Sequence, residues 1–294
     1  MHSLVVGMGI GGLYKTVLEQ QGGTVVTVDQ NELTQPVHTC IEDALTPGVK
    51  YGTAHICTPN YMHEAHAGMV ADKARIVFVE KPGVKTADAW CSLYKQHPNT
   101  RFMMVKNNMW RQEIALLRQL AAKSKRIELS WIRRDCVPNP GSWFTTRSMS
   151  YGGVSRDLMP HLLSLYIALE PEWHSTFPDE ISIAQRWQLA DITTTGYGTV
   201  KQDGTYDVDD RCKLQFGSKW AITADWRSMG DDRFDIVFHL NDGTLQTVDL
   251  GWCPEDAYSR MIADATSNLG SDEFWLAQQQ QDVWIHELLD FVSK

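Results

Sequence analysis

A glycine-rich segment near the start of the chain limits the possible folds more than any other feature of the sequence. The apolar residues Leu4–Val6 run directly into Gly7-Met8-Gly9-Ile10-Gly11-Gly12, and a helical pattern with Leu13, Val17 and Leu18 on one face follows. A strand, a tight glycine turn and a helix in this order are typical of the first part of a doubly wound parallel sheet. We therefore expect an α/β domain at this end of the chain.

Three glycines of this segment have the spacing of a dinucleotide-binding fingerprint. Gly7 permits the tight turn, Gly9 lets the backbone approach a pyrophosphate group, and Gly12 lets the helix pack closely on the strand. The next expected strand, Thr24–Asp29, ends in an acid about 20 residues further on, where the fingerprint requires one.

The acid at the end of this second strand indicates which cofactor is preferred. A carboxylate there accepts hydrogen bonds from the ribose hydroxyls and repels a 2′-phosphate, and no Lys or Arg follows Asp29 in Gln30-Asn31-Glu32. We expect NAD, with NADP less favoured. A glycine-rich turn in an α/β protein without a nucleotide, and a methyltransferase, remain alternatives on this segment alone.

The rest of the pattern divides the chain into two domains. Over residues 1–108 short β-branched runs alternate with helical patterns, which predicts a Rossmann domain with a doubly wound parallel sheet. Over residues 109–294 we expect an α+β domain for substrate binding and oligomerisation, with a large, mainly antiparallel open sheet. Its expected strands are Arg126–Ile132, Ile181–Leu189, Arg211–Phe216, Trp220–Trp226, Phe234–Leu240 and Thr244–Leu250.

Composition and charge argue against several classes of protein. The net charge of −9 disfavours a nucleic-acid surface that neutralises phosphates. The six cysteines are scattered, so we expect neither a disulfide framework nor a metal site. No apolar run is long enough to span a bilayer, and the chain reaches its first strand too early for a signal peptide. We expect a soluble cytoplasmic protein with a small-molecule substrate and no nucleic-acid or membrane partner.

Two further motifs carry side chains that suit proton transfer. Glu80-Lys81-Pro82 follows an expected strand, and a lysine at a strand's carboxyl end can hold a substrate hydroxyl or stabilise its deprotonated form. Asp157 and His161 follow Gly152-Gly153, and histidine has an ordinary pKa suited to proton transfer near neutral pH. Either one helix covers both residues, or a helix starts at Pro160 and Asp157 lies in the preceding turn.

Together these segments resemble the glucose–fructose oxidoreductase/inositol dehydrogenase/rhizopine-catabolism (Gfo/Idh/MocA) family of NAD(P)-dependent sugar oxidoreductases. The resembling pieces occur in the family's order: GMGIGG from Gly7, ICTPNYMH at Ile56–His63, VEKPGVKT at Val79–Thr86 and GGVSRDLMPHLLSL at Gly152–Leu165. The motifs are specific up to the end of the last segment and weak beyond it. A methyltransferase accounts for neither the lysine motif nor the segment with Asp157 and His161.

The resemblance implies a role for individual residues. Lys81, Asp157 and His161 match the family's catalytic residues, and a cis peptide bond is implied between Lys81 and Pro82. Asn60 is implied to reach the nicotinamide end of the cofactor. The implied cofactor-binding residues are Gly7, Met8, Gly9, Ile10, Gly12, Asp29, Thr58, Pro59, Asn60, His63, Glu80, Lys81 and Pro82.

The activity implied by the resemblance is hydride transfer between nicotinamide and a secondary alcohol or ketone carbon of a sugar, cyclitol or sugar nucleotide. In the oxidation direction His161 would take the hydroxyl proton, Lys81 would stabilise the alkoxide, and Asp157 would orient His161 or the substrate. Two alternatives share the fold: a reductase of a bilin or dihydrodiol, and a non-catalytic NAD-binding regulator.

The substrate and the oligomeric state depend on weaker signals. The segment Lys106–Trp110 lacks an arginine often found there in the family, and Gly83 replaces an aliphatic residue. Since tryptophan suits a sugar face and arginine suits phosphate, the candidate substrate residues beside Lys81, Asp157 and His161 are Trp131, Arg133, Arg134, Trp143 and Trp226. We also expect a homodimer or homotetramer through the second sheet, because apolar alternation on both faces of Arg211–Trp226 would leave exposed hydrophobic surface.

Overall fold

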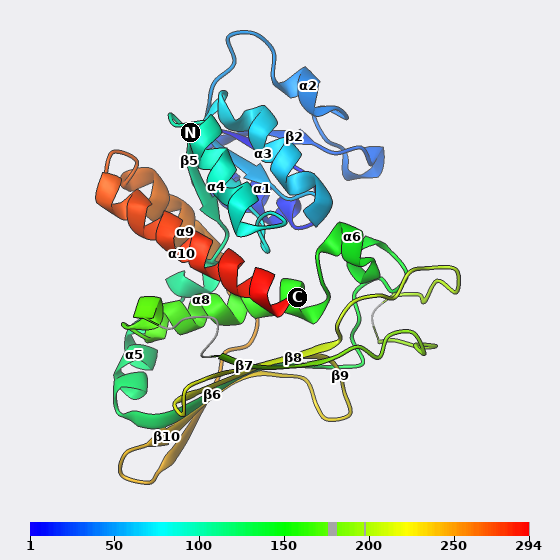
Figure 1. Ribbon diagram of the computed structural model, residues 1–294. Coiled ribbons are helices and arrows are strands. Elements are labelled where there is room, and N and C mark those ends of the chain that lie inside the picture. The colour runs from blue at the N-terminus through cyan, green and yellow to red at the C-terminus, as the bar shows by residue number, and fades with distance from the viewer. Residues whose placement is uncertain (176–180, 197, 294) are drawn as a thin grey trace. The chain divides into compact units, whose positions relative to one another are not determined.

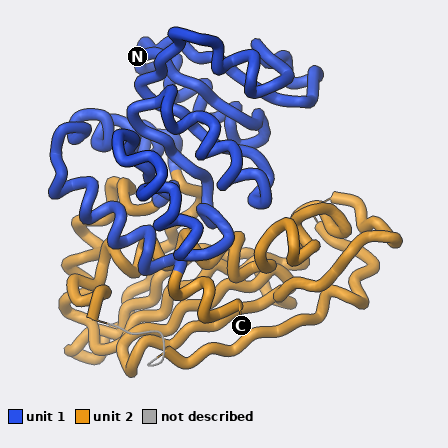
Figure 2. The backbone as a smooth tube through the Cα atoms, turned by 45° about the horizontal axis from the view of Figure 1, so that its top comes forward, with its two compact units in different colours: residues 1–106, 254–286 blue, residues 107–253, 287–294 orange. Residues whose placement is uncertain are grey.

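The chain forms two compact units in the computed structural model, which describes residues 1–175, 181–196 and 198–293. The first unit consists of residues 1–106 and 254–286, and the second of residues 107–253 and 287–294 (Figure 2). The change of unit after Lys106 lies close to the boundary expected after residue 108, but residues 254–286 return to the first unit.

The first unit contains a five-stranded parallel sheet with the order β2-β1-β3-β4-β5 (Figure 1). Its strands are β1 (His2–Val6), β2 (Thr24–Val28), β3 (Tyr51–Ile56), β4 (Ala74–Val79) and β5 (Arg101–Met104). Its helices before residue 106 are α1 (Gly11–Gln20), α2 (Ile41–Ala44), α3 (His63–Ala71) and α4 (Ala87–Gln96). The expected doubly wound sheet is confirmed, and its winding reverses between β1 and β3.

The packing of α1 on β1 depends on a different glycine from the one expected. A Cβ atom on Gly11 would lie 2.8 Å from Cγ1 of Val5, whereas one on Gly12 would meet no atom within 4 Å. On the same helix, the side chains of Tyr14 and Leu18 are fully buried. The close approach of helix and strand therefore requires Gly11, and the packing role expected for Gly12 is wrong.

Two helices near the end of the chain pack within the first unit. They are α9 (Glu255–Ser267), which packs against α1, and α10 (Asp272–Val292), which belongs to the first unit up to His286. Nε2 of Gln21 donates to the hydroxyl of Ser259 at 2.7 Å, and the carboxylate of Asp282 accepts from the amide of Met104 at 3.0 Å. The expected assignment of every residue after 108 to the second domain therefore fails for residues 254–286.

The second unit contains a six-stranded sheet with the order β11-β10-β6-β9-β8-β7. Only β6 and β9 pair in parallel, so the expected mainly antiparallel sheet is confirmed. Its strands are β6 (Ser124–Arg134), β7 (Ile181–Arg186), β8 (Arg211–Phe216), β9 (Trp220–Ser228), β10 (Arg233–Leu240) and β11 (Leu245–Asp249). Its helices are α5 (Ile114–Ala122), α6 (Arg147–Ser150), α7 (Val154–Asp157) and α8 (Met159–Leu169).

The two faces of this sheet differ in polarity. Along β8, Cys212, Leu214 and Phe216 are buried on one face, whereas Arg211, Lys213 and Gln215 alternate with them on the other. The residues of β9 alternate in the same way. Those paired with the buried residues of β8 are apolar: Trp220, Ile222 and Ala224. Those paired with the polar residues of β8 are Ala221, Thr223 and Asp225. Apolar alternation on both faces, which was the argument for an exposed hydrophobic sheet surface, is therefore wrong.

Candidate functional site

Most of the expected cofactor-binding residues follow the carboxyl ends of three neighbouring strands. The glycine segment follows β1, residues 57–60 follow β3, and Glu80-Lys81-Pro82 follows β4. In an open α/β sheet ligands bind outside the carboxyl ends of the strands, at the point where the winding reverses. Here that point lies between β1 and β3, so the structure brings these segments to the edge of the sheet at which ligands bind in folds of this kind.

The glycine segment forms a tight turn against the end of β3. Gly7 has a φ of +90°, and a Cβ atom on it would lie 2.7 Å from the carbonyl carbon and oxygen of Cys57. Cβ atoms on Gly9 and Gly12 would meet no protein atom within 4 Å. Helix α1 begins here without a side-chain cap, so its first N–H groups remain available to an anion.

Asp29 connects the end of β2 to the glycine segment. Its carboxylate accepts a hydrogen bond from the amide of Met8 at 2.5 Å and one from the amide of Asn31 at 2.8 Å. Two backbone donors therefore fix the orientation of this half-buried carboxylate. Each carboxylate oxygen can accept more than one hydrogen bond, so capacity for ribose hydroxyls is left.

The segment after β3 is tied to the lysine motif through His63. Nδ1 of His63 lies 2.7 Å from the carbonyl oxygen of Gly83, and Nε2 lies 2.7 Å from that of Thr58. Burial lowers the pKa of His63 to about 4, so the ring is neutral at pH 7 and its single N–H donates to one carbonyl at a time. Asn60, which belongs to the same segment, is buried.

The lysine motif forms a turn that is held from several sides. The Lys81–Pro82 bond is cis, which confirms the expectation, and the amide of Gly83 donates to the carbonyl of Glu80 at 2.9 Å. The carboxylate of Glu80 accepts from the hydroxyl of Tyr14 at 2.6 Å and from the amide of Lys81 at 3.2 Å. Burial, and then the charge of Glu80, raise the pKa of Tyr14 well above its ordinary value, so its hydroxyl stays protonated and keeps donating.

The peptide unit between Gly83 and Val84 contacts two histidines. Its carbonyl oxygen faces Nδ1 of His63, and its amide donates to Nε2 of His286 on α10 at 3.1 Å. Nδ1 of His286 is 2.6 Å from the carbonyl of Asp282, so this ring carries its proton on Nδ1. His286 also stacks on Trp90, with ring centroids 5.0 Å apart. Sequence reasoning missed His286, which lies 202 residues from Val84 in the chain.

The other two expected catalytic residues lie in the second unit. Asp157 ends α7, and His161 follows Pro160 in the first turn of α8. One helix over both residues is therefore wrong. The other alternative is closer, but α8 starts at Met159 rather than at Pro160, and Asp157 lies in a short helix of its own. The half-buried carboxylate of Asp157 accepts a hydrogen bond from Nε1 of Trp226 at 3.1 Å. Trp226, a candidate substrate residue, is itself buried and so orients Asp157.

Asp209 fixes the start of the segment that carries both residues. Its carboxylate accepts hydrogen bonds from the amides of Gly153 and Ser155 at 2.8 and 3.0 Å and from the Ser155 hydroxyl at 2.7 Å. A Cβ atom on Gly153 would lie 1.8 Å from the carbonyl oxygen of Asp209, so only glycine fits there. Burial raises the pKa of Asp209, and these donors oppose the rise.

His161 contacts a short chain of buried polar groups. Its Nδ1 lies 3.3 Å from Nδ2 of Asn108, and Oδ1 of Asn108 accepts from Nε of Arg111 at 2.8 Å. Because an arginine only donates, Arg111 fixes the orientation of the Asn108 amide, whose NH₂ group then faces His161. Nδ1 of His161 therefore acts as an acceptor, and the neutral ring carries its proton on Nε2. Arg111 follows directly after the segment in which the family's arginine is missing.

A cluster of aromatic rings lies beside His161 and contacts it through Trp131. Trp131 lies 5.3 Å from His161 between ring centroids and stacks on Phe234 at 4.3 Å. Trp252 meets Trp131 edge-on at 5.9 Å, and the Arg133 guanidinium lies over the Trp252 ring at 5.6 Å. Trp131 thus lies next to His161, whereas Arg133 is connected to His161 only through the rings of Trp252 and Trp131. The sequence analysis did not single out Phe234 or Trp252.

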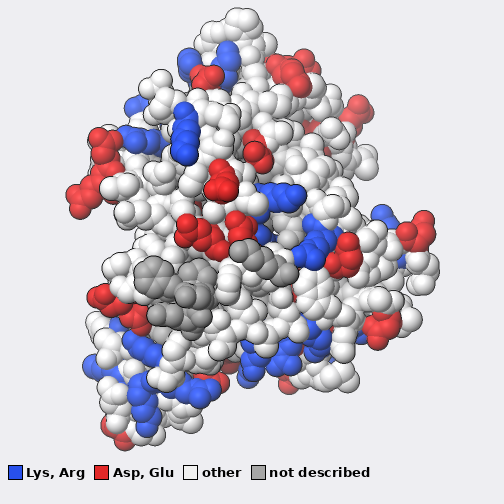
Figure 3. Space-filling view, viewed as in Figure 1, with Lys and Arg blue, Asp and Glu red and all other residues white. Residues whose placement is uncertain are grey.

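The remaining two candidates have other neighbours. Trp143 stacks on Phe144 with ring centroids 3.8 Å apart. The side chain of Arg134 is largely exposed, with Nη1 at 4.0 Å from Asp231, and the backbone amide of Arg134 donates to the carboxylate of Asp232. On the face of the molecule seen in Figure 3, acidic and basic side chains are interspersed. Among the described residues no group of His, Cys, Asp and Glu side chains is suited to bind a metal ion, and none of the six cysteines is in a disulfide bond.

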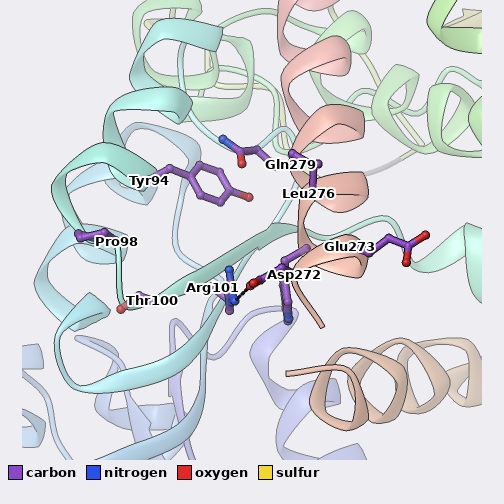
Figure 4. Close-up of a pocket in the computed structure, with 9 residues that line it drawn as sticks. Tyr94, Pro98, Thr100, Arg101, Asp272, Glu273, Leu276 and Gln279 are labelled. Atoms are coloured by element: carbon purple, nitrogen blue, oxygen red, sulfur yellow. Dashed lines mark hydrogen bonds and ion pairs between the residues drawn. The ribbon is translucent and has the colours of Figure 1, made fainter. Parts of the chain in front are cut away.

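A pocket of about 380 Å³ lies away from the candidate site. It is lined by residues of α4, the loop from α4 to β5, the start of β5 and α10 (Figure 4): Tyr94, Pro98, Thr100, Arg101, Asp272, Glu273, Trp275, Leu276 and Gln279. Arg101 donates to Asp272 across it at 2.5 Å. Because Arg101 is the first residue of β5, the pocket lies at the amino edge of the sheet, opposite the carboxyl edge where ligands bind.

Comparison with known proteins extends the sequence resemblance to the fold. No protein-family model matches the chain. Over 180 residues it is 28% identical to the "Putative UDP-kanosamine synthase oxidoreductase subunit" of Amycolatopsis mediterranei (strain S699). The match covers 55% of this chain, and it spans half the length of that relative.

Two solved structures match over the full chain. GenD2 from gentamicin A biosynthesis, in complex with NAD, has a TM-score of 0.74 at 17% identity over 100% of this chain and 94% of its own. Levoglucosan dehydrogenase, in complex with NADH and levoglucosan, has a TM-score of 0.73 at 15% identity over 100% and 97% of the two chains. Since identities this low show the fold, the motifs and the fold together confirm the resemblance of this chain to the glucose–fructose oxidoreductase/inositol dehydrogenase/rhizopine-catabolism family.

Proposed function

We propose that the protein is an NAD-dependent dehydrogenase or reductase of a secondary alcohol or ketone carbon in a sugar, cyclitol or sugar nucleotide. The observation that carries this proposal is the carboxyl edge of the first sheet. Helix α1 starts there without a side-chain cap, the carboxylate of Asp29 accepts from the amide of Met8, and the amide of Lys81 donates to the carboxylate of Glu80. The relatives support the chemistry, because their names describe an NAD complex, an NADH complex with a sugar, and a sugar-nucleotide oxidoreductase subunit.

The residues at this edge fit NAD. The Cβ positions of Gly9 and Gly12 are open, and the first N–H groups of α1 suit a pyrophosphate. Asp29 would accept hydrogen bonds from the adenosine ribose and would repel the 2′-phosphate of NADP. When bound, NAD supplies the hydride chemistry. Thr58, Pro59, Asn60 and Glu80-Lys81-Pro82 would hold its nicotinamide end, with Asn60 as the proposed contact.

Lys81 and His161 are the residues that we assign to the reacting oxygen. Because Asn108 donates to Nδ1 of His161, the neutral ring carries its proton on Nε2, and this N–H is the group that we assign as a donor to that oxygen. In the reduction direction the Lys81 ammonium would then donate the proton that completes the hydroxyl. This differs from the sequence-based hypothesis, which gives the proton transfer to His161. Asp157, oriented by Trp226, would support the substrate electrostatically.

A substrate panel tests this proposal directly. Purified protein is assayed for NADH formation with sugars, cyclitols and sugar nucleotides, and for NADH consumption with the corresponding ketones. We expect turnover with at least one member and its loss in Lys81→Ala. NAD binding without any turnover would favour a non-catalytic regulator, and turnover on a bilin or dihydrodiol alone would favour the other alternative on this fold.

The oligomeric state and the surroundings of the protein remain predictions. A homodimer or homotetramer through the second sheet would use its polar face, where Asp225 pairs with Arg186 at 2.9 Å and with Arg211 at 3.5 Å. Light scattering of wild type and Asp225→Ala would test it. Among the described residues no helix is both long and apolar enough to cross a membrane. Location in the cytoplasm and the lack of nucleic-acid partners are likewise proposals.

A further inference from the structure

Trp252 is an exposed tryptophan in a defined position near His161. Its side chain is 76% exposed, which is unusual for so large an apolar ring. One edge contact joins it to Trp131, with ring planes at 86°, and Trp131 in turn contacts His161. A large aromatic ring that stays in water beside a candidate active site is suited to bind a ligand.

The backbone before Trp252 is held by the same arginine that reaches His161. Nη1 of Arg111 donates to the carbonyl of Leu250 at 2.6 Å, and Nη2 donates to that of Gly251 at 3.0 Å. Its Nε donates to Asn108, which contacts His161. Arg111 is only 4% exposed, and Asn108, His161 and Leu250 are also buried, so most of this hydrogen-bonded chain is shielded from water and hard to rearrange. Trp252 and His161 are therefore held in a fixed spatial relationship within one unit.

A second cation lies at the Trp252 ring itself. The guanidinium of Arg133 lies over the ring, and it is anchored by Asp232 at 3.2 Å and by Sγ of Cys136 at 3.0 Å. The Arg133 side chain is 22% exposed, so it can offer further N–H donors to a ligand beside the ring. The pair presents a flat apolar surface next to hydrogen-bond donors, which suits a ring with polar substituents.

We propose that Trp252 binds the part of the substrate that lies beyond the reacting sugar. The substrate class is then a sugar joined to a second ring, either another sugar or a nucleobase, whose flat face stacks on the indole while Arg133 donates to oxygens near the linkage. This inference rests on the proposed function, since the reacting sugar is placed at His161.

The test measures binding rather than turnover. Isothermal titration with glucose, maltose, UDP-glucose and UDP is carried out on wild type, Trp252→Ala and Trp252→Phe, with and without NADH. We expect Trp252→Ala to weaken a two-ring ligand by about tenfold or more, as for other stacking contacts, and to weaken glucose less. Trp252→Phe should restore much of the affinity. Maltose and UDP-glucose distinguish a second sugar from a nucleobase.

Trp187 provides a matched control in the same unit. It is 45% exposed and also carries an arginine, Arg147, over its ring at 5.3 Å. Trp187→Ala should leave every affinity unchanged. Three results would overturn the inference. The first is equal affinity of wild type and Trp252→Ala, and the second is that wild type binds no two-ring probe. The third is a smaller particle for Trp252→Ala in size-exclusion chromatography, which would place Trp252 in a subunit interface. If binding depends on Trp252 but no substrate turns over, Trp252 is still confirmed as a binding residue for a two-ring ligand, and only the proposed dehydrogenase activity fails.

Discussion

Gly83 and His286 occupy adjoining space so closely that a Cβ atom on Gly83 would lie 2.3 Å from Nε2 of His286. The φ of Gly83 is +78°, which also favours glycine. The aliphatic residue common at this position in the family would collide with the His286 ring. The departure from the family at residue 83 is therefore explained by a histidine contributed from the far end of the chain.

Gly83→Ala should lower the free energy of unfolding by more than the left-handed backbone conformation of residue 83 alone would cause. The left-handed φ costs an alanine about 1–2 kcal/mol, and the collision with His286 adds about 1–3 kcal/mol of overpacking. Urea unfolding measures the total. Gly22→Ala is the matched control, because Gly22 has a φ of +75° and no atom within 4 Å of its Cβ position.

The double variant Gly83→Ala/His286→Ala separates the two contributions to the loss of stability, the left-handed backbone of residue 83 and its collision with His286. Removing the ring removes the collision with His286 and leaves Sδ of Met104 at 3.2 Å from the new Cβ atom. Gly83→Ala should therefore cost much less stability in the His286→Ala background than in wild type. The same penalty for Gly83→Ala with and without His286 would show that the ring does not limit residue 83.

Asn108→Asp should change the tautomer of His161. The amide NH₂ donates to Nδ1, whereas a carboxylate there accepts and so favours a proton on Nδ1. If Nε2–H donates to the reacting oxygen, turnover at pH 7 should fall by about 10²–10³-fold, the usual worth of such a donor. Nitrogen-15 NMR of the ring in wild type should show the proton on Nε2. Asn108→Ala, which removes the contact without reversing it, should lose less activity.

Acid should destabilise the first unit through His55. Burial lowers the pKa of His55 to about 3, whereas the ordinary value is near 6.5. Between these values the unfolded state binds more protons, so stability is complete above pH 6.5 and falls as the pH drops towards 3. The loss from this residue alone should be about 2 kcal/mol at pH 5.

Urea unfolding at pH 7 and pH 5 measures this dependence. His55→Gln keeps a partner for Thr53, which lies 3.0 Å from Nε2 of His55, and should reduce the difference between the two pH values. His174→Gln, at an exposed histidine, serves as the control. An unchanged difference in His55→Gln would contradict the assignment of acid sensitivity to this residue.

The sequence predicts well whatever depends on local pattern. Hydrophobic runs predicted the positions of most strands, and the lysine motif predicted the cis peptide bond before Pro82, because neighbouring residues determine both features. The sequence did not predict the roles of His286, Asp209 or Trp252. Each of these residues contacts a segment that is distant in the chain, and none of them belongs to a recognisable motif. The packing glycine was misassigned because Gly11 and Gly12 are adjacent and only the helix rotation decides which one faces Val5.

Asp29→Asn should weaken the discrimination between NAD and NADP. The amide oxygen can still accept from the amide of Met8, so the glycine turn keeps a partner. The loss of charge removes both the charge-assisted bonds to the ribose and the repulsion of a 2′-phosphate, and the ratio of the two dissociation constants should shift by about 10–100-fold. Fluorescence titration with both cofactors measures the ratio. Glu32→Gln, a nearby exposed acid, is the control, and wild-type protein that prefers NADP would refute the role of Asp29.

Lys81→Ala and His161→Ala should each reduce turnover by about 10²–10⁴-fold while NAD affinity changes little. If both residues act on one oxygen, the double variant should lose less than the product of the two single losses, because each depends on the other being in place. The competing explanation is that His161 only supports the packing of Trp131. In that case His161→Ala would lower the free energy of unfolding and leave turnover per folded molecule intact. Turnover, NAD affinity and urea stability are therefore measured on the same preparation, and losses that simply multiply would show that the two residues act independently.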